Sequence, residues 1–425
     1  MPSRERHRLP GAALVRRASR TGARRTLVAG AKRATKVAAT PIIAAARASG
    51  WFRLATAAIH ADELLASRGA NDGVASWERD LSEPRRSLSE LGAGDPCPTT
   101  TPVSTRLTIL DGPRGSFAFC DNHVVDDRLR IVIERARSET GHTFTFRDLH
   151  AWWAPLDRPR RISGTVAYLS NTGVHNFGHW LLFVYPLVKY YRDYLGAEPD
   201  YYYLGAPIQR WHYDTLAKVG IEPDRILADA VTGDRMLACL ADWTIPPPTA
   251  FLDFSTEMLR KARDQSAPRR RVYISRAMRP TRRPFLNEGE CMDVLAEHGF
   301  DAYYTETLTL EEETELFASA EVVVALHGAG LANLLFCHPG TVVVELFPHG
   351  YTSEWFAEVS AVRQITYANL YGEATETTGL SPPEHPVLVD PEKLDAVLTA
   401  ATKADAETRG PIGYSEPTPR DLRVS

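Results

Sequence analysis

The chain has 425 residues, of which 44% are hydrophobic, 24% charged and 9% aromatic. This length and composition suit a globular protein of two domains with tails, and they exclude collagen-like, wholly disordered and multi-span membrane proteins. With a net charge of −4 and a pI of about 6.4, the chain as a whole lacks the basic charge of a nucleic-acid binder, so we expect no nucleic-acid partner.

Basic residues gather at the N-terminus. Residues 1–50 contain twelve Lys and Arg but one acidic residue, Glu5, so the remaining residues carry a net charge of −15. The apolar stretch at 37–46 is short and interrupted by Pro41, which is unlike a signal peptide or a membrane span. We predict a disordered arm over 1–50, with attraction to an anionic membrane surface as the functional alternative.

The number and spacing of the cysteines indicate the redox state of the cellular compartment. Five are present, widely spaced and without a CxxC pair: Cys97, Cys120, Cys239, Cys291 and Cys337. The odd number and the spacing argue against a disulfide framework and a zinc ribbon, and they favour a reducing compartment. We therefore expect a cytoplasmic protein, with peripheral contact at the inner face of the membrane as an option for the basic arm.

Pattern and turn residues divide the first half of the chain. A helix and a linker rich in Ser, Pro, Thr and Gly are predicted over 51–105, and strand-like pieces follow at 107–110 and 130–133. Pro186 should kink or divide a helix over 179–195. The other elements predicted here are strands at 165–170, 201–204, 225–228 and 236–240, and helices at 207–219 and 250–263.

The second half alternates strands and helices more regularly. Strands are predicted at 271–275, 302–304, 321–326, 341–347 and 364–367, and helices at 287–298, 310–319, 331–336 and 353–359. Apolar strands separated by helices indicate a parallel sheet covered on both faces. The predicted fold class is α/β, with an N-terminal domain over 106–265, a C-terminal domain over 266–405, a tail over 406–425 and a cleft between the domains as the default site.

The most informative stretch is VVVALHGAGLANLLFCHPGTVVVELFP, which begins at residue 322. It predicts a strand, a glycine-containing turn, a short helix and a second strand that ends in a carboxylate. Small residues let a ligand approach the backbone, and a helix N-terminus suits a diphosphate. The carboxylate at that sheet edge could accept hydrogen bonds from ribose hydroxyls, whereas the alternative is a turn that serves only packing. The predicted binding residues here are His327, Gly328, Ala329, Gly330, Leu331 and Glu345.

A second stretch, YISRAMRPTRRPFLNE, places several arginines between a strand and a helix. Loops at the carboxyl ends of parallel strands face the cleft, so guanidiniums there could clamp phosphate oxygens. Arg276 directly follows the strand, and Arg282 and Arg283 precede the helix. The alternative is a solvated basic loop.

The third stretch, NTGVHNFGHW, carries His175 and His179 in a loop between a strand and a helix. Their spacing resembles that of metal ligands on a helix, but Asn176 stands where a zincin has Glu. We favour a general base or a phosphate donor, because histidine titrates near neutrality, with His179 the first candidate. The alternative for both is a histidine that orders the loop.

Several catalytic motifs are missing from the sequence. It contains no GxSxG, no GxxxxGK[ST], no GxGxxG and no Asp-x-Asp at a predicted strand end. A metal-bound diphosphate is therefore not indicated, and we expect positive side chains to neutralise the phosphates.

The motifs NFGHW, YISR…RR…LNE and HGAGLANLLF…PG…VVELFP occur in this order, and residues 165–370 resemble glycosyltransferase family 61. That family includes plant pentosyltransferases, animal N-acetylglucosaminyltransferases and bacterial proteins of capsular polysaccharide synthesis. The resemblance implies a GT-B-like fold of two Rossmann-like domains, an inverting transfer, no strict metal requirement and a donor site that includes Asn333. Ala332 departs from the Thr or Ser that relatives often carry, which would remove one hydroxyl contact.

We therefore predict an inverting glycosyltransferase that moves a sugar from a nucleotide diphosphate sugar to a glycan or lipid-linked glycan, in bacterial capsular or exopolysaccharide synthesis. Residues 106–265 would bind the acceptor, and 266–405 the nucleotide sugar, which is the co-substrate; no other cofactor is expected. One alternative is a noncatalytic nucleotide- or glycan-binding protein of polysaccharide assembly. Another is a metal hydrolase built on His175 and His179.

Overall fold

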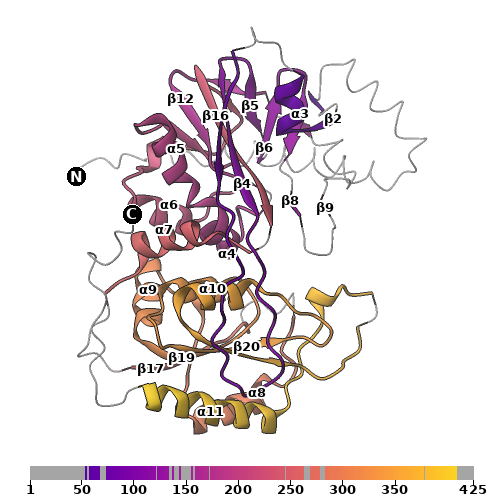
Figure 1. The fold of residues 1–425 in the computed structure, drawn as a ribbon, viewed down its shortest axis with the longest axis vertical. Helices are drawn as coiled ribbons and strands as arrows, with labels where there is room; N and C mark the ends of the chain where they lie inside the picture. Colours follow the sequence, from indigo (N-terminus) through magenta and orange to yellow (C-terminus); the bar gives the residue numbers. More distant parts are fainter. Residues whose placement is uncertain are drawn as a thin grey trace, which may run out of the picture.

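The computed structural model describes most of the chain after residue 72. The described residues are 53–54, 57–67, 73–120, 122–133, 136–137, 143–144, 155–156, 158–171, 173–244, 246–262, 269–277, 283–377 and 379–408. The predicted arm over 1–50 and the tail beyond 408 lie outside them. Figure 1 shows two α/β bodies stacked along the long axis, which we call the upper half (to α7) and the lower half (from β17).

In the described residues, the upper half contains two large sheets and one separate pair of strands, β1 with β10. Its strands are β1 (Arg53–Leu54), β2 (Ala57–His60), β3 (Ala75–Asp80), β4 (Thr105–Pro113), β5 (Phe117–Cys120), β6 (His123–Asp126), β7 (Arg130–Ile133), β8 (Ala136–Arg137), β9 (Thr143–Phe144), β10 (Pro155–Leu156), β11 (Arg160–Arg161), β12 (Thr165–Tyr168), β13 (Tyr201–Tyr203), β14 (Ile226–Leu227), β15 (Val231–Thr232) and β16 (Arg235–Thr244). The larger sheet has the order β14-β13-β12-β16-β4-β3, and the second has the order β11-β15-β5-β6-β7-β2.

The sheets of the upper half are mixed, unlike the all-parallel sheet of the lower half. Strands β14, β13, β12 and β16 are parallel, but β4 pairs antiparallel with both β16 and β3. Strands β5, β6 and β7 form antiparallel hairpins. Their connections are too short for the crossover that parallel neighbours need.

The helices of the upper half include one that proline divides. They are α3 (Ala61–Ala66), α4 (Phe177–His179), the π-helix η2 (Trp180–Val184), α5 (Leu187–Leu195), α6 (Arg210–Lys218), the 3₁₀ turn η3 (Pro223–Arg225) and α7 (Thr249–Leu259). The helix predicted over 179–195 is interrupted at Pro186, which stands at the N-cap of α5. This prediction is confirmed.

The lower half contains one sheet, and all its strands are parallel. The strands are β17 (Arg270–Ile274), β18 (Asp301–Tyr303), β19 (Ala320–Leu326), β20 (Val342–Phe347) and β21 (Thr366–Tyr371), in the order β18-β17-β19-β20-β21. The helices are α8 (Glu288–Glu297), η4 (Thr305–Thr307), α9 (Leu310–Ser319), the 3₁₀ helix η5 (Ala329–Phe336), α10 (Trp355–Arg363), η6 (Pro382–Glu384) and α11 (Pro391–Thr408). Helices α9 and α10 lie on the face toward the upper half, and α8 and α11 on the other, so the predicted two-sided covering is confirmed (Figure 1).

The end of the region predicted as helix and linker (51–105) is instead ordered against the edge of the lower sheet. Residues 81–104, which we call the strap, leave β3, reach the lower half and return to β4 (Figure 1). The main-chain N–H of Leu91 donates to Tyr367, and that of Asp95 donates to Asn369. Pro and Gly disfavour a helix in this stretch but leave N–H and C=O groups that can pair with the edge strand β21.

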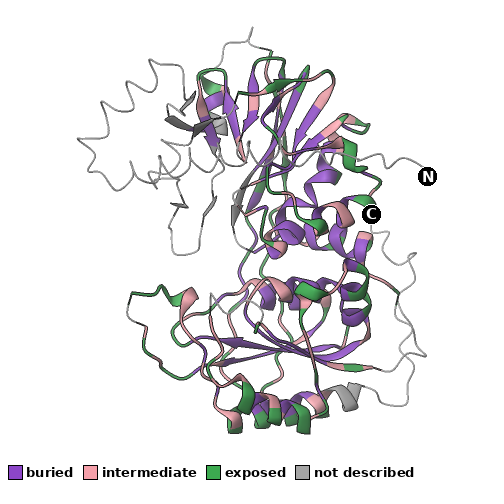
Figure 2. Ribbon diagram, turned by 180° about the vertical axis from the view of Figure 1, so that it is seen from behind, coloured by how far each residue is buried: buried purple, intermediate pink, exposed green. Residues whose placement is uncertain are grey.

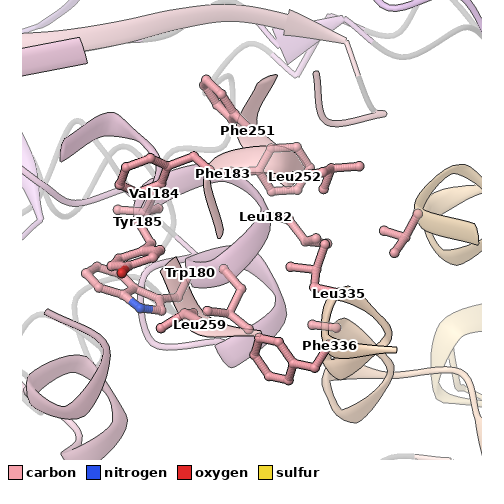
Figure 3. Packing of buried hydrophobic residues seen from close by; sticks show 14 of the residues in the cluster. Trp180, Leu182, Phe183, Val184, Tyr185, Phe251, Leu252, Leu259, Leu335 and Phe336 are labelled. Atoms are coloured by element: carbon pink, nitrogen blue, oxygen red, sulfur yellow. The ribbon is translucent and has the colours of Figure 1, made fainter. Parts of the chain in front are cut away.

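The two halves share one hydrophobic core. A single buried cluster joins side chains of η2 and α7 to side chains of η5 and the lower sheet. Leu182 and Leu259 of the upper half and Leu335 and Phe336 of the lower half lie in this cluster (Figure 3). Figure 2 shows buried residues continuing from one half to the other. Within the described residues, no helix is both long and apolar enough to cross a membrane.

Candidate functional site

The loop NTGVHNFGHW of the upper half meets the HGAG turn of the lower half. The loop follows β12 and ends in α4, which packs against η5. A Cβ on Gly178 would lie 3.5 Å from the Cα of Ala329, which is an ordinary van der Waals contact, so the two backbones are neighbours here. Loops that follow the parallel strands β12 and β19 therefore come together where the halves join.

His327 follows β19 directly and is buried. Its Nδ1 lies 2.5 Å from Oε1 of Glu345, and its Nε2 lies 3.4 Å from the hydroxyl of Tyr351. Its ring stacks on that of Phe347, with centroids 5.1 Å apart. Contacts at both nitrogens and on one face fix the plane of the imidazole.

Glu345 is fully buried, with a relative exposure of 0%. Its Oε1 contacts His327, and its Oε2 accepts a hydrogen bond of 2.6 Å from the hydroxyl of Tyr367. The predicted contact between Glu345 and ribose is corrected accordingly, since no exposed carboxylate oxygen remains. Alternation along β20 directs this side chain to the same face as the core residue Val343.

Two guanidiniums gather at the turn. Nη1 of Arg276 donates to the main-chain oxygen of His327 at 2.9 Å, and Nη1 of Arg283 donates to the same oxygen. Arg283 also donates through Nε to Pro383 and lies over the Tyr351 ring. Its φ of 55° is rare for a residue other than glycine, and such conformations cluster at functional sites. The paired cations make the turn attractive to an anion.

The sequence suggested that Gly328 makes room for a ligand. In the structure it makes room for the guanidinium of Arg276. A Cβ at this position would lie 2.7 Å from Nη1 of Arg276. At Gly330 a Cβ would make an ordinary contact of 3.4 Å with Ile274. Leu331 is buried in the core, and its N–H donates to the oxygen of Gly328 at 3.0 Å.

His179 lies at the junction of the halves. Its ring centroid lies 4.8 Å from that of Trp355 and 6.1 Å from that of Phe183. Burial lowers the pKa of His179 to about 4, so the imidazole is neutral near pH 7 and has a free lone pair, although it is a weaker base than an exposed histidine. A Cβ on Gly173 would lie 2.7 Å from its Nδ1, so glycine leaves room for this ring position.

His175 lies apart from His179, in the turn before α4. It is exposed, and its Nε2 lies 2.9 Å from Nδ2 of Asn122. Asn176 caps α4 between the two histidines, so they do not share a helical face. In the described part of the chain, no three or more His, Cys, Asp or Glu side chains gather as metal ligands. The geometry therefore gives the metal hydrolase alternative no support.

The structure does not support a direct donor contact for one predicted residue, Asn333, and does not describe another, Arg282. Asn333 is fully buried in η5, next to the buried Glu313 of α9, which is unlike a residue that contacts a ligand directly. Burial raises the pKa of Glu313 to about 8. Arg282 lies outside the described residues.

Three aromatic residues at the site were not predicted from the sequence. Tyr351 contacts His327, Trp355 contacts His179, and Tyr367 contacts Glu345. Tyr351 and Trp355 follow β20, and their position after a parallel strand could have identified them as candidate site residues. Tyr367 lies within a strand, where its residue type alone predicts only core packing.

The fold and site define an α/β protein whose polar residues gather where the carboxyl ends of two sets of parallel strands meet. Residues 177–344 match the family model described as Glycosyltransferase 61. This region of the chain is similar to that glycosyltransferase family.

Relatives with the description Protein O-linked-mannose beta-1,4-N-acetylglucosaminyltransferase 2 match a limited region. The Xenopus tropicalis protein is 30% identical over 135 residues, covering 30% of this chain and 22% of that protein. The Homo sapiens protein is 31% identical over 120 residues, covering 27% and 20%. The Tetraodon nigroviridis protein is 38% identical over 81 residues, covering 18% and 14%. The chain thus spans less than a quarter of the length of these relatives.

A solved structure of a flavo di-iron protein mutant from Thermotoga maritima covers 54% of this chain and 52% of its own. With a sequence identity of 9% and a TM-score of 0.23, this similarity is too weak to indicate a shared fold or function.

Proposed function

We propose that the protein is a glycosyltransferase that moves a sugar from a nucleotide diphosphate sugar to a hydroxyl of an acceptor. The observation that carries this proposal is the meeting of Gly178 and Ala329, which brings the NFGHW loop to the HGAG turn. The HGAG turn and all of NFGHW after Asn176 lie inside the region that matches the glycosyltransferase family. The turn, with Arg276 and Arg283 on one carbonyl, supplies positive charge for a diphosphate.

The arrangement we propose is GT-B-like, with the acceptor on residues 106–265 and the donor on 266–405. The parallel lower sheet and the parallel strands β12, β13 and β16 support it, because the loops after β12 and β19 meet. Ligands of open α/β sheets bind at the carboxyl ends of the strands.

The proposed reaction is a single displacement with inversion. The acceptor hydroxyl oxygen attacks the anomeric carbon, the bond from that carbon to the phosphate oxygen breaks, and the nucleoside diphosphate leaves with the electron pair. The neutral imidazole of His179 takes the hydroxyl proton. The cations at the turn stabilise the negative charge of the leaving group, and the proposal includes no metal or cofactor.

The relatives suggest which substrates to try first. Because their name specifies transfer of N-acetylglucosamine, we propose UDP-N-acetylglucosamine as the first donor. For the acceptor we propose a glycan or lipid-linked glycan of bacterial capsular or exopolysaccharide synthesis, at the cytoplasmic face. The twelve basic residues of 1–50 support contact with an anionic membrane surface, where such an acceptor would lie.

The test is a thermal-shift panel of nucleoside diphosphates and nucleotide sugars in EDTA, followed by transfer assays with the strongest ligand. Ligand binding to the native state raises its stability by mass action. We expect one nucleotide family to stabilise the protein and Arg276→Ala to lose most of that shift, because the turn loses a guanidinium.

Arg270→Ala is the matched control, since Arg270 is an exposed residue at the opposite end of β17. It should keep the wild-type shift. If folded wild-type protein responds to no nucleotide, the proposed function is wrong. If it binds nucleotides but transfers no sugar to any acceptor, the noncatalytic binding protein becomes the better conclusion.

A further inference from the structure

The contacts of His327 hold its main chain and its Nδ1, while Nε2 faces the hydroxyl of Tyr351 at 3.4 Å. The main-chain N–H donates to Leu346 at 2.8 Å, and the main-chain oxygen accepts from Arg276 and Arg283. In the ring, Nδ1 lies 2.5 Å from Glu345. Each of these contacts is a normal or short hydrogen bond, so together they fix the orientation of Nε2.

Glu345 determines which ring nitrogen carries the proton. An ionised carboxylate can only accept hydrogen bonds, and the second oxygen of Glu345 already accepts from Tyr367. Toward an ionised Glu345, a neutral His327 ring carries its proton on Nδ1, which leaves a lone pair on Nε2.

The present neighbour of Nε2 is a hydroxyl group at a long distance. The oxygen of Tyr351 lies 3.4 Å away, beyond the usual length of a strong hydrogen bond to a hydroxyl donor. Tyr351 is half-buried in the middle of the segment between β20 and α10. Another hydroxyl could take this place with little loss to the protein.

We propose that Nε2 of His327 accepts a hydrogen bond from a hydroxyl group of the bound nucleotide sugar, and that Glu345 is the positioning residue that selects the required tautomer. The inference rests on the proposed function. A lone pair repels phosphate oxygens, so the partner is a hydroxyl, which replaces the predicted phosphate contact of His327. The hydroxyl can belong to the ribose or to the transferred sugar.

The binding test compares nucleotides that differ by one hydroxyl. The nucleoside diphosphate with the largest thermal shift, and its GlcNAc derivative, are titrated by calorimetry against their 2′-deoxy- and 3′-deoxyribose forms and against forms lacking one sugar hydroxyl. Loss of the partner hydroxyl should weaken binding to the wild type about five- to tenfold. If the deoxyribose forms bind more weakly, the partner hydroxyl belongs to the ribose. If the forms lacking a sugar hydroxyl bind more weakly, it belongs to the transferred sugar.

The same titrations with Glu345→Gln should show no more than a twofold loss on removing that hydroxyl. A glutamine amide can donate or accept, so it no longer selects one tautomer. Tyr351→Phe is the matched control, because it removes the present hydroxyl without touching Glu345, and it should keep the five- to tenfold difference. If wild-type binding ignores every hydroxyl, the inference is overturned while the proposed function stands.

A spectroscopic measurement tests Glu345 without any ligand. In ¹⁵N-histidine-labelled protein, the His327 ring, assigned with His327→Gln, should show the Nδ1–H tautomer in the wild type and a mixture in Glu345→Gln. A ring protonated at Nε2 in the wild type overturns the positioning role. If no nucleotide binds, the proposed function and the hydroxyl contact both fail, and this spectrum alone decides the role of Glu345.

Discussion

At the scale of single residues, the main-chain oxygen of His327 organises the candidate donor site. It holds Arg276 and Arg283 together at the turn, and the absence of a side chain at Gly328 makes room for the first of them. Gly328 and the two arginines therefore form one arrangement. In the sequence they belong to separate motifs, because Arg276 and His327 are 51 residues apart.

Gly328→Ala should displace Arg276. The new Cβ would lie 2.7 Å from its Nη1, whereas the φ of 162° is extended backbone that alanine adopts without strain. We expect nucleotide affinity to fall about tenfold, as for the loss of one charge-assisted hydrogen bond, with only a small change in melting temperature. Calorimetric titration measures the affinity.

Gly289→Ala is its control, because a Cβ there would meet no atom within 4 Å. It should bind as the wild type does. Wild-type affinity in Gly328→Ala would contradict a role for the Arg276 position.

At the scale of elements, the strap joins the halves through a buried ion pair. Nη1 of Arg86 lies 3.2 Å from Oε2 of Glu358 in α10, and Oε1 of Glu358 accepts from the N–H of Thr101. Arg86 also donates to Pro247, directly before α7. One arginine thus contacts residues of both halves.

Arg86→Ala should destabilise the protein by about 3 kcal/mol, because it leaves the carboxylate of Glu358 buried without its cation. Urea unfolding gives the free energy, and hydrogen exchange should show faster exchange at strap residues 91 and 95. Arg85→Ala removes an exposed neighbour and should change little. Equal stability of the two variants would show that the ion pair is not structural.

Helix α9 carries a buried carboxyl group that makes stability depend on pH. Burial raises the pKa of Glu313 from 4.5 to about 8, so between these values the folded state binds more protons than the unfolded state. Its contribution to stability is present below pH 4.5 and is lost as pH rises through about 8. Glu313→Gln should remove this fall in stability between pH 5 and 8.

Unfolding by urea at pH 5 and pH 8 measures the effect. Glu315→Gln, an exposed change on the same helix, should keep the wild-type dependence. If Glu313→Gln loses as much stability as the wild type over this interval, Glu313 is not the titrating group.

At the scale of the whole molecule, the shared core predicts that the two halves unfold together. Leu335 of η5 packs in the same cluster as Leu182 of η2 (Figure 3). Leu335→Ala should cost about 2–5 kcal/mol and lower the hydrogen-exchange protection of the upper sheet as well as the lower. Calorimetry should show one transition, whereas two separate transitions would contradict a shared core.

The sequence predicted the lower half better than the upper half. Continuous apolar strands such as 321–326 have only one stable use, a sheet buried on both faces, so order and type followed directly. In the upper half, strands of only four residues such as β5 and β6 form a hairpin whose further partners depend on distant chain segments. The strap escaped prediction for the same reason, because its Pro- and Gly-rich composition does not reveal the sheet edge it pairs with.

The sequence by itself determined the α/β class, the division of the helix at Pro186, and the three motifs that resemble glycosyltransferase family 61. These are properties of local pattern, proline geometry and residue type. Only the tertiary structure decided that Glu345 supports His327 from inside the core, and that Arg276 occupies the space above Gly328. Burial and hydrogen-bond partners arise when strands distant in sequence become neighbours, so no local pattern contains them.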